Sequence, residues 1–439
     1  MMNLILENWD LILYGVGLAV VLLIFMPFSP MLIDVLMLPR GIQIGIFRYR
    51  YILWAVVWAC CLTLLARGLN VAEPAGWPAP LVGFLKGLLG DWGPAFFGQA
   101  ADPVWLSITV ITVLVMAMMF WSGYVPYVMT PPKKSDIVGI EDADKILSDD
   151  EMILGVVNGD EVRAYSRDAI SRPHFFNDTV GDERLMISYC ILCNSAMAFK
   201  TELGGKPMDL KCVTAYNNNI IYYDPDSGNY IQQMDGAVFH GPDKGAALEG
   251  HPVVQSTWGQ WKQLHPDTKY FHAPSSSLRD KMVDKMLQMM IPISSLSRRK
   301  KPWHRIRGKL DTRLGAMSLV YAVEHGDDHA TYAEAELKKD PVINDSVGGK
   351  PIVVLYNAEL NIGAVYSRNV EGKDLTFEAA TGDGGAVVTD RETGSLWDVN
   401  GNAVSGELAG KSLDAVPHFN KLFWFSWPLF KDQTRVGPA

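Results

Sequence analysis

The chain has 439 residues, of which 49% are hydrophobic, and its formal net charge is −9 at pH 7. This length is enough for two or three domains. The excess of 48 acidic over 39 basic residues argues against a nucleic-acid-binding protein, which needs a basic surface. Five cysteines do not indicate the disulfide framework of a small secreted domain.

Hydrophobic residues are concentrated in the first 135 positions. Three stretches without a charged residue, at 11–33, 51–66 and 104–125, predict transmembrane helices. Trp105 and Tyr124 lie near the two ends of the third stretch, as interfacial aromatic residues do. Residues 1–135 are therefore predicted to cross the lipid bilayer several times.

Beyond residue 140 the pattern changes to short alternating runs separated by Gly, Asp and Asn, which is typical of strands and tight turns. Few segments show helical periodicity, so we expect an α+β fold that is mainly β. The runs that predict strands are 152–157, 185–189, 220–223, 351–356 and 386–388.

The soluble part contains an internal duplication. At an offset of 167 residues, His174 to Lys206 aligns without a gap on Pro341 to Lys373. Asn177-Asp178 falls on Asn344-Asp345, and Tyr189 falls on Tyr356. We therefore predict two β-rich repeats, at 140–273 and 318–436, joined by a connector at 274–317.

Shared residues are expected to form the scaffold, and residues present in one copy only are better candidates for chemistry. Asn177, Asp178, Asn344 and Asp345 are interpreted as turn caps. Trp258 and Trp261 match Trp424 and Trp427 at an offset of 166, and all four are predicted core anchors. By contrast, Cys190, Cys193 and His174 are replaced in the second copy by Asn357, Leu360 and Pro341.

Cys190 and Cys193 follow a predicted strand at a spacing that lets two thiols share one soft metal ion or close a disulfide. His174 lies one strand earlier, and Met197 could add a thioether. This set suits copper, with zinc as the other option. His240, also specific to the first copy, is a reserve ligand.

Two other interpretations of the cysteine pair stay open. It could be a dithiol redox centre of the thioredoxin type, although there the first cysteine begins a helix and Asn194 to Phe199 could equally begin a strand. It could also be a purely structural pair. Haem is less well supported, because Asn194 rather than His follows Cys193.

The connector combines methionines at helical spacing, from Met282 to Met290, with a basic cluster. Such a combination favours docking on anionic lipid headgroups. A solvated linker is the alternative. The basic residues that would contact the membrane are Arg298, Arg299, Lys300, Lys301, Arg305 and Arg307.

Several of these motifs are similar to a known family. Val157 to Tyr165, His174 to Gly181 and Tyr-Cys-Ile-Leu-Cys-Asn-Ser-Ala at 189–196 resemble the DUF3179 family of bacterial and archaeal proteins, and the resemblance covers roughly residues 140–436. It implies that the His, the Asn-Asp pair and the Cys pair are characteristic positions, and it implies no reaction. This chain has Ile191 where the family more often has Pro, and Phe175 where an acidic residue is common.

These observations predict a metal-binding or redox accessory protein in the cytoplasmic membrane of a bacterium or archaeon. Arg40, Arg48 and Arg50 place the loop after the first span in the cytoplasm. Three spans would leave the soluble part inside and a fourth, near 80–97, would place it outside. We expect the outer face because relatives are commonly exported. The rival hypothesis is a non-catalytic scaffold or subunit of a membrane complex.

Overall fold

The structure is a computed structural model, and it describes residues 39–49, 52, 79–80, 83, 129–131, 135–274, 281, 285, 299–303, 305–380 and 388–439. The chain divides into two compact units, Met1–Val128 and Met129–Ala439. In the first unit the helix α4 spans Arg40–Arg48. No helix among the described residues is long and apolar enough to span a bilayer. Apart from Ile52, the predicted spans at 11–33, 51–66 and 104–125 lie outside these residues.

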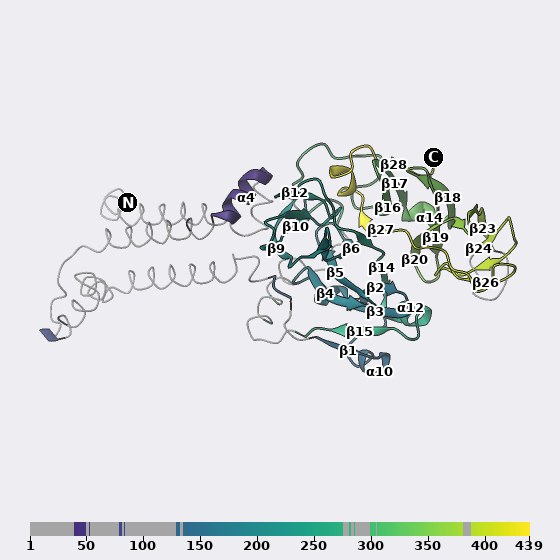
Figure 1. Cartoon of the computed structure of the whole chain (residues 1–439), viewed down its shortest axis with the longest axis horizontal. Helices are drawn as coiled ribbons and strands as arrows, with labels where there is room; N and C mark the ends of the chain where they lie inside the picture. Colours follow the sequence, from purple (N-terminus) through teal and green to yellow (C-terminus); the bar gives the residue numbers. More distant parts are fainter. Residues whose placement is uncertain are drawn as a thin grey trace, which may run out of the picture. The chain divides into compact units, whose positions relative to one another are not determined.

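The second unit is mainly β, as the sequence predicts, and its strands form several small sheets (Figure 1). The first half carries three sheets of four or five strands and one short hairpin. One sheet runs β1 (Asp136–Val138), β15 (Lys269–His272), β3 (Glu161–Ser166), β2 (Met152–Asn158), β14 (Val254–Thr257). The next runs β13 (Gly250–His251), β6 (Ser195–Lys200), β5 (Glu183–Cys190), β4 (Phe175–Val180). The third runs β12 (Val238–His240), β11 (Tyr230–Gln232), β10 (Asn219–Tyr223), β9 (Lys211–Tyr216), and the hairpin joins β7 (Glu202–Leu203) to β8 (Lys206–Pro207). The helices are α10 (Ile140–Ala143), α11 (Arg167–Ile170) and α12 (Trp258–Leu264).

The second half follows the same chain order. One sheet runs β27 (His418–Phe423), β16 (Leu319–His325), β17 (Asp328–Ala333), β28 (Arg435–Val436). Another runs β18 (Val342–Val347), β19 (Lys350–Asn357), β20 (Ile362–Ser367), and a hairpin joins β21 (Asn369–Val370) to β22 (Lys373–Asp374). The last runs β23 (Phe377–Ala379), β24 (Val388–Asp390), β25 (Leu396–Trp397), β26 (Ala403–Ser405). Helix α14 (Glu334–Leu337) and the short 3-10 helix η3 (Trp427–Leu429) complete it.

Eight consecutive elements of the first half recur in the second at a constant offset. β2 begins at Met152 and β16 at Leu319, which is the offset of 167 found in the sequence, and both have the same length. The matching pairs are β2 and β16, β3 and β17, α11 and α14, β4 and β18, β5 and β19, β6 and β20, β7 and β21, and β8 and β22.

The two halves also repeat the same anchoring contacts. The indole of Trp261 donates to the hydroxyl of Thr268 at 2.8 Å, and Trp427 donates to Thr434 at 3.0 Å. Trp258, Trp261, Trp424 and Trp427 are all buried. Each half closes with a short strand that returns parallel to an earlier one, β15 beside β3 and β28 beside β17. The indoles thus tie each closing segment to its own half.

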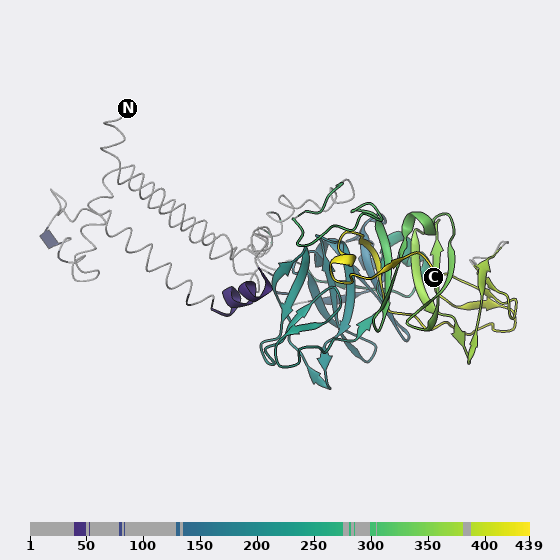
Figure 2. The same ribbon diagram turned by 90° about the horizontal axis from the view of Figure 1, so that it is seen from above.

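The halves lie side by side and meet through strands near their middle (Figures 1 and 2). β27 of the second half contacts β6 of the first, and β14 of the first contacts β20 of the second. The amide of Gln255 on β14 donates to the carbonyl oxygen of Asn420 on β27 at 2.5 Å. The end of the β5–β6 hairpin lies at this junction.

The shared Asp residues are not turn caps, because Asp178 lies within β4 and Asp345 within β18. The turns come later, at Gly181 and Gly348, where φ is positive. Each carboxylate instead accepts a hydrogen bond from a tyrosine hydroxyl of the neighbouring sheet, Tyr165 at 2.8 Å and Tyr332 at 2.5 Å. These carboxylates bridge two sheets of one half.

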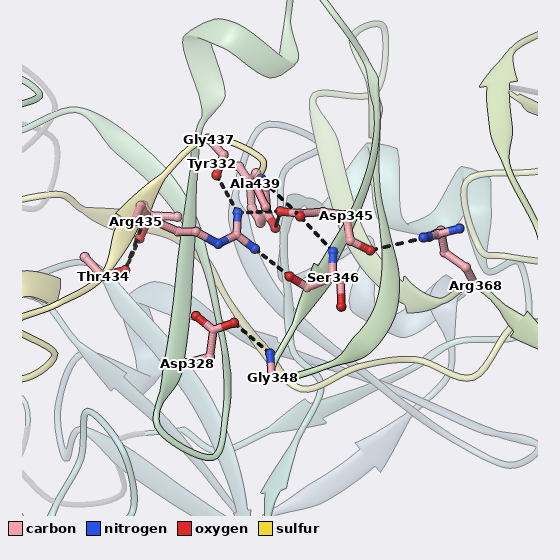
Figure 3. Close-up of polar contacts among 11 residues, drawn as sticks. Asp328, Tyr332, Asp345, Ser346, Gly348, Arg368, Thr434, Arg435, Gly437 and Ala439 are labelled. Carbon is pink, nitrogen blue, oxygen red and sulfur yellow. Dashed lines mark hydrogen bonds and ion pairs between the residues drawn. The ribbon is translucent and has the colours of Figure 1, made fainter.

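Each carboxylate also meets an arginine, but from different strands. Arg163 on β3 lies 3.3 Å from Asp178, whereas Arg435 on β28 lies 2.6 Å from Asp345 (Figure 3). In the parallel pairing of β28 with β17, Arg435 stands beside Ala330, which is the counterpart of Arg163. Both halves therefore keep an arginine–aspartate ion pair, but the arginine lies on β3 in the first half and, in the second, on β28 beside β17.

We predict that the Asp345 carboxylate stabilises the folded protein in a pH-dependent way. Burial opposes its ionisation, yet Arg435 and Tyr332 outweigh this and lower its pKa. The contribution of Asp345 to the free energy of unfolding is therefore present above the ordinary carboxyl pKa. It is lost as the pH falls through the lower pKa that Asp345 has in the folded protein. Asp345→Asn should cost about 3 kcal/mol at pH 7, because it leaves Arg435 without its charge partner. Urea unfolding at several pH values should show that the difference in unfolding free energy between wild type and Asp345→Asn shrinks below pH ~4. Glu371→Gln, at an exposed ion pair with Lys411, is the control and should leave the unfolding midpoint unchanged.

Candidate functional site

The cysteine pair lies at the turn of the β5–β6 hairpin. Cys190 is the last residue of β5 and pairs in register with Ser195, the first residue of β6. Asn194 completes the turn with φ +56, a left-handed conformation that Asn tolerates better than most residues. Because a strand follows Cys193, the pair does not stand at a helix N-terminus as it does in thioredoxin-type centres.

Both thiols are free and fully buried. The Cys190 sulfur donates to the carbonyl oxygen of Asn218 at 3.4 Å. The Cys193 sulfur lies 3.1 Å from the Ser195 hydroxyl and accepts from the Asn219 amide at 3.4 Å. Side-chain donors therefore converge on Cys193 and not on Cys190.

The Asn219 amide is fixed by a buried polar network. Its Nδ2 also donates to Gln233 Oε1 at 2.6 Å. Its Oδ1 accepts from Gln232 Nε2 at 2.6 Å and from the backbone N–H of Met234 at 3.0 Å. Two donors on the oxygen leave the amide one orientation, with its N–H groups toward Cys193 and Gln233. The sulfur therefore faces a donor that is held in place before any reaction.

The Ser195 hydroxyl has two acceptors for one hydrogen. It donates to Gln233 Oε1 at 2.7 Å, so a protonated Cys193 donates to Ser195. When Cys193 is ionised, the hydroxyl can turn to the sulfur, because Gln233 Oε1 keeps its hydrogen bond from Asn219. The network can thus serve both protonation states without leaving Gln233 Oε1 unpaired.

These surroundings give Cys190 and Cys193 different pKa values. Burial, and after it the neighbouring Cys193 thiol, raise the pKa of Cys190 well above its ordinary value. Burial also opposes ionisation of Cys193, but bonds from Cys190, Ser195 and Asn219 outweigh it and lower the Cys193 pKa. Cys212, buried on β9 without such donors, has a raised pKa that follows from burial alone. Cys193 is therefore the more acidic thiol of the pair.

A second hairpin supplies the groups that meet both sulfurs. β9 and β10 are joined through Asn217 and Asn218, whose φ angles of +50 and +62 match the two-residue turn common in hairpins. This turn brings the Asn218 carbonyl to Cys190 and the Asn219 amide to Cys193. The run of three Asn after a strand-like segment is the sequence signal that could have identified it.

His174 lies beside the pair through its backbone. Its carbonyl accepts from the N–H of Tyr189 at 3.0 Å and from the hydroxyl of Tyr222 at 3.3 Å. Its φ is +78, in the region that favours glycine, and its Nδ1 is buried without a hydrogen-bond partner. Burial lowers its pKa to about 4, so the imidazole is neutral at pH 7. The hydroxyl of Tyr222 also hydrogen-bonds with the hydroxyl of Ser188, two residues before Cys190.

The other predicted ligands are placed as follows. Met197 is buried on β6, and its register partner Ser188 shows that it shares a sheet face with Cys190. His240 is exposed at the end of β12 with its ring against Tyr230. Within the part of the chain that the structure describes, no three His, Cys, Asp or Glu residues are grouped so that they could hold a metal ion.

Most of the connector, including Arg298 and the methionines from Met282 to Met290, lies outside the described residues. Lys300, Lys301 and Arg305 are exposed, and Arg299 stacks on Trp303 at 4.1 Å. Arg307 packs over Tyr216 at 4.6 Å, and its backbone N–H donates to Asn217 at 2.8 Å. The end of the connector therefore packs on the β9–β10 hairpin, and membrane docking stays a prediction.

Comparison with protein families covers most of the chain. Residues 123–434 match the family model described as a protein of unknown function (DUF3179). The chain belongs to the DUF3179 family. This confirms the resemblance predicted from the motifs, and it extends the match upstream of residue 140. No curated protein and no solved structure matches the DUF3179 chain.

His174 generates a prediction for pH dependence. Its folded pKa of about 4 lies below the ordinary 6.5, so its stabilising contribution is complete above pH 6.5 and is lost as the pH falls toward 4. The loss amounts to about 3 kcal/mol at most. His174→Asn, which tolerates the positive φ, should unfold with a weaker pH dependence in this window. Denaturant midpoints measured at pH 7, 5.5 and 4 would test it; parallel curves for the two proteins would contradict it.

Proposed function

We propose that the first half of this DUF3179 protein carries a dithiol–disulfide redox centre formed by Cys190 and Cys193. One observation carries the proposal: two buried thiols lie at one hairpin turn, and side-chain donors stabilise the anionic form of only one, Cys193. A thiolate is the nucleophile of thiol–disulfide exchange, and its neighbour resolves the mixed disulfide.

The reaction would proceed in two balanced steps. The Cys193 thiolate attacks one sulfur of a small disulfide and releases one small thiolate. The released thiolate takes the proton of Cys190, and the Cys190 sulfur then attacks Cys193, which releases the second small thiolate. Two electrons pass from the pair to the small disulfide. Both sulfurs are fully buried, so any disulfide reaches them only when the turn opens. A small disulfide needs a smaller opening than a protein does, and burial therefore favours a small partner.

The arrangement also explains the difference between the halves. The second half keeps the hairpin but has Asn357 and Leu360 in place of the cysteines. At the offset of 166 that aligns Asp224 with Asp390, Gly385 stands in place of Asn219 and Val399 in place of Gln233. Thiols and donors are absent together, so we infer that a duplication left the second half as scaffold.

A soft metal ion is the second candidate. Two fully buried cysteine sulfurs, with the buried Met197 thioether on the same sheet face as Cys190, favour copper(I) over zinc. Elemental analysis of protein purified from its native membrane tests this possibility. About one copper per chain, lost in Cys190→Ser/Cys193→Ser, would support it over the redox centre.

We also propose that residues 1–135 anchor the protein in the cytoplasmic membrane, with the soluble part on the outer face. The three uncharged stretches of the sequence support the anchor. The outer face follows from the expectation that relatives are exported and requires a fourth crossing, near 80–97. In this setting the centre would serve a membrane oxidoreductase, and subunits of such a complex would be its partners. A non-catalytic scaffold predicts instead that loss of both thiols leaves partner binding and activity intact.

Equilibration with glutathione buffers tests the redox function. We expect the pair to titrate as a two-electron couple with a midpoint between about −280 and −120 mV, the range of thioredoxin-like dithiols. Quenched alkylation and mass spectrometry should show Cys190 and Cys193 disappearing together while Cys212 stays reactive after unfolding. Cys212→Ser is the control and should keep the same midpoint. Cys190 and Cys193 both remaining as free thiols at the most oxidising ratio would contradict the proposal.

A further inference from the structure

The second half touches the reactive turn directly. The backbone N–H of Phe423 on β27 donates to the carbonyl of Cys193 at 2.9 Å. The side-chain amide of Asn194 donates to the carbonyl of Lys421 at 2.6 Å. Gln255 Nε2 reaches the carbonyl of Asn194 at 3.1 Å, and it also holds the carbonyl of Asn420. Residues 193 and 194 are therefore bound on several sides at the junction.

The strand that makes these contacts is irregular where they occur. β27 pairs with β16 at Val320 and again at Ala322, but the register shifts between these residues. Asn420 and Lys421 both stand opposite the intervening Tyr321, which is a β-bulge, and Lys421 has φ +57. A bulge bends a strand and changes the direction of its groups.

The equivalent strand of the first half has no such irregularity. β14, the counterpart of β27, pairs with β2 in continuous register from Val254 to Thr257. In this half Gln255 stands in the position of Lys421, and its amide reaches the carbonyl of Asn194 much as the Lys421 ammonium reaches Asn361. The bulge is thus specific to the half without cysteines, and it points its backbone at the half that has them.

The Lys421 side chain secures the bulge. It is buried, and its ammonium donates to the carbonyl of Asn361 at 2.5 Å. A buried lysine with a single carbonyl acceptor is costly, and burial lowers its pKa to about 8. Its charged surroundings are Glu334, Lys338 and Arg167. A buried lysine is more readily explained where it fixes a particular backbone conformation, here that of the bulge, than where it only fills space.

We infer that the Asn420–Lys421 bulge of the second half is the positioning device for the reactive turn of the first, with Lys421 as its positioning residue. By holding Cys193 and Asn194, it keeps the Cys193 sulfur within reach of Ser195 and Asn219. The inference rests on the proposed redox function, because a reactive turn needs positioning only if Cys193 reacts. The contacts themselves belong to the reduced protein, so the inference can be tested without measuring enzyme turnover.

The test compares two equivalent asparagines. Asn194→Gly removes the amide that bonds Lys421 and Tyr189, and Asn361→Gly removes the equivalent amide, which bonds Tyr356. Glycine accepts the left-handed φ at both positions. Thiolate absorbance at 240 nm is followed against pH in the reduced full-length protein, with Cys190→Ser and Cys193→Ser variants to assign the signal.

We expect Asn194→Gly to raise the Cys193 ionisation midpoint by at least one pH unit, whereas Asn361→Gly leaves it unchanged at a similar loss of thermal stability. Equal shifts in both variants, or no shift in Asn194→Gly, would overturn the inference.

If Asn194→Gly does not fold, Lys421→Met provides the measurement. It keeps the side-chain stem and should raise the midpoint by about half a unit with a melting temperature within about 4 °C of wild type. An unchanged midpoint in Lys421→Met would likewise overturn the inference. A midpoint shift with no glutathione-dependent disulfide would reject the redox function and leave the positioning role standing.

Discussion

The site depends above all on the side-chain amide of Asn194. Its oxygen accepts the hydroxyl of Tyr189 at 2.8 Å, and its nitrogen donates to the carbonyl of Lys421 at 2.6 Å. The first bond closes the turn on its own hairpin, and the second ties that turn to the other half. With φ +56, this residue also lets the chain reverse directly after Cys193. The positions of both sulfurs follow from where this amide is held.

The same turn occurs twice, which separates scaffold from chemistry. Asn361 has φ +49 and accepts the hydroxyl of Tyr356 at 2.6 Å, so the second half builds this hairpin without cysteines. Tyr189, Asn194 and their counterparts are therefore explained by folding alone. Cys190 and Cys193 are not needed for the hairpin, and their network of amides has no counterpart in the sequence of the second half. A purely structural role for the thiols does not explain why donors converge on Cys193.

Short-range patterns of the sequence predicted much of this architecture. Alternation of apolar residues located β2, β5, β10 and β19, and the mainly β fold is confirmed. The Asn-Asp motif was misread as a turn, because a carboxylate inside a strand is unusual unless a partner such as Tyr165 or Tyr332 reaches it from another sheet. Asn219, Gln232 and Gln233 were missed for a related reason. They belong to a different sheet from Cys193, and no local pattern reports which polar residues a distant hairpin will bury.

The order of ionisation within the pair tests this account most directly. Protein labelled with ¹³C at the cysteine β-carbons reports each thiol separately in an NMR titration of the reduced state, with single Cys→Ser variants for assignment. The account predicts that Cys193 ionises first, below the ordinary thiol pKa of about 8.5, while Cys190 and Cys212 stay protonated until well above it. If Cys190 ionises first, or if all three titrate above the ordinary value, the network of Asn219 and Ser195 does not create a reactive thiolate and the proposed centre is wrong.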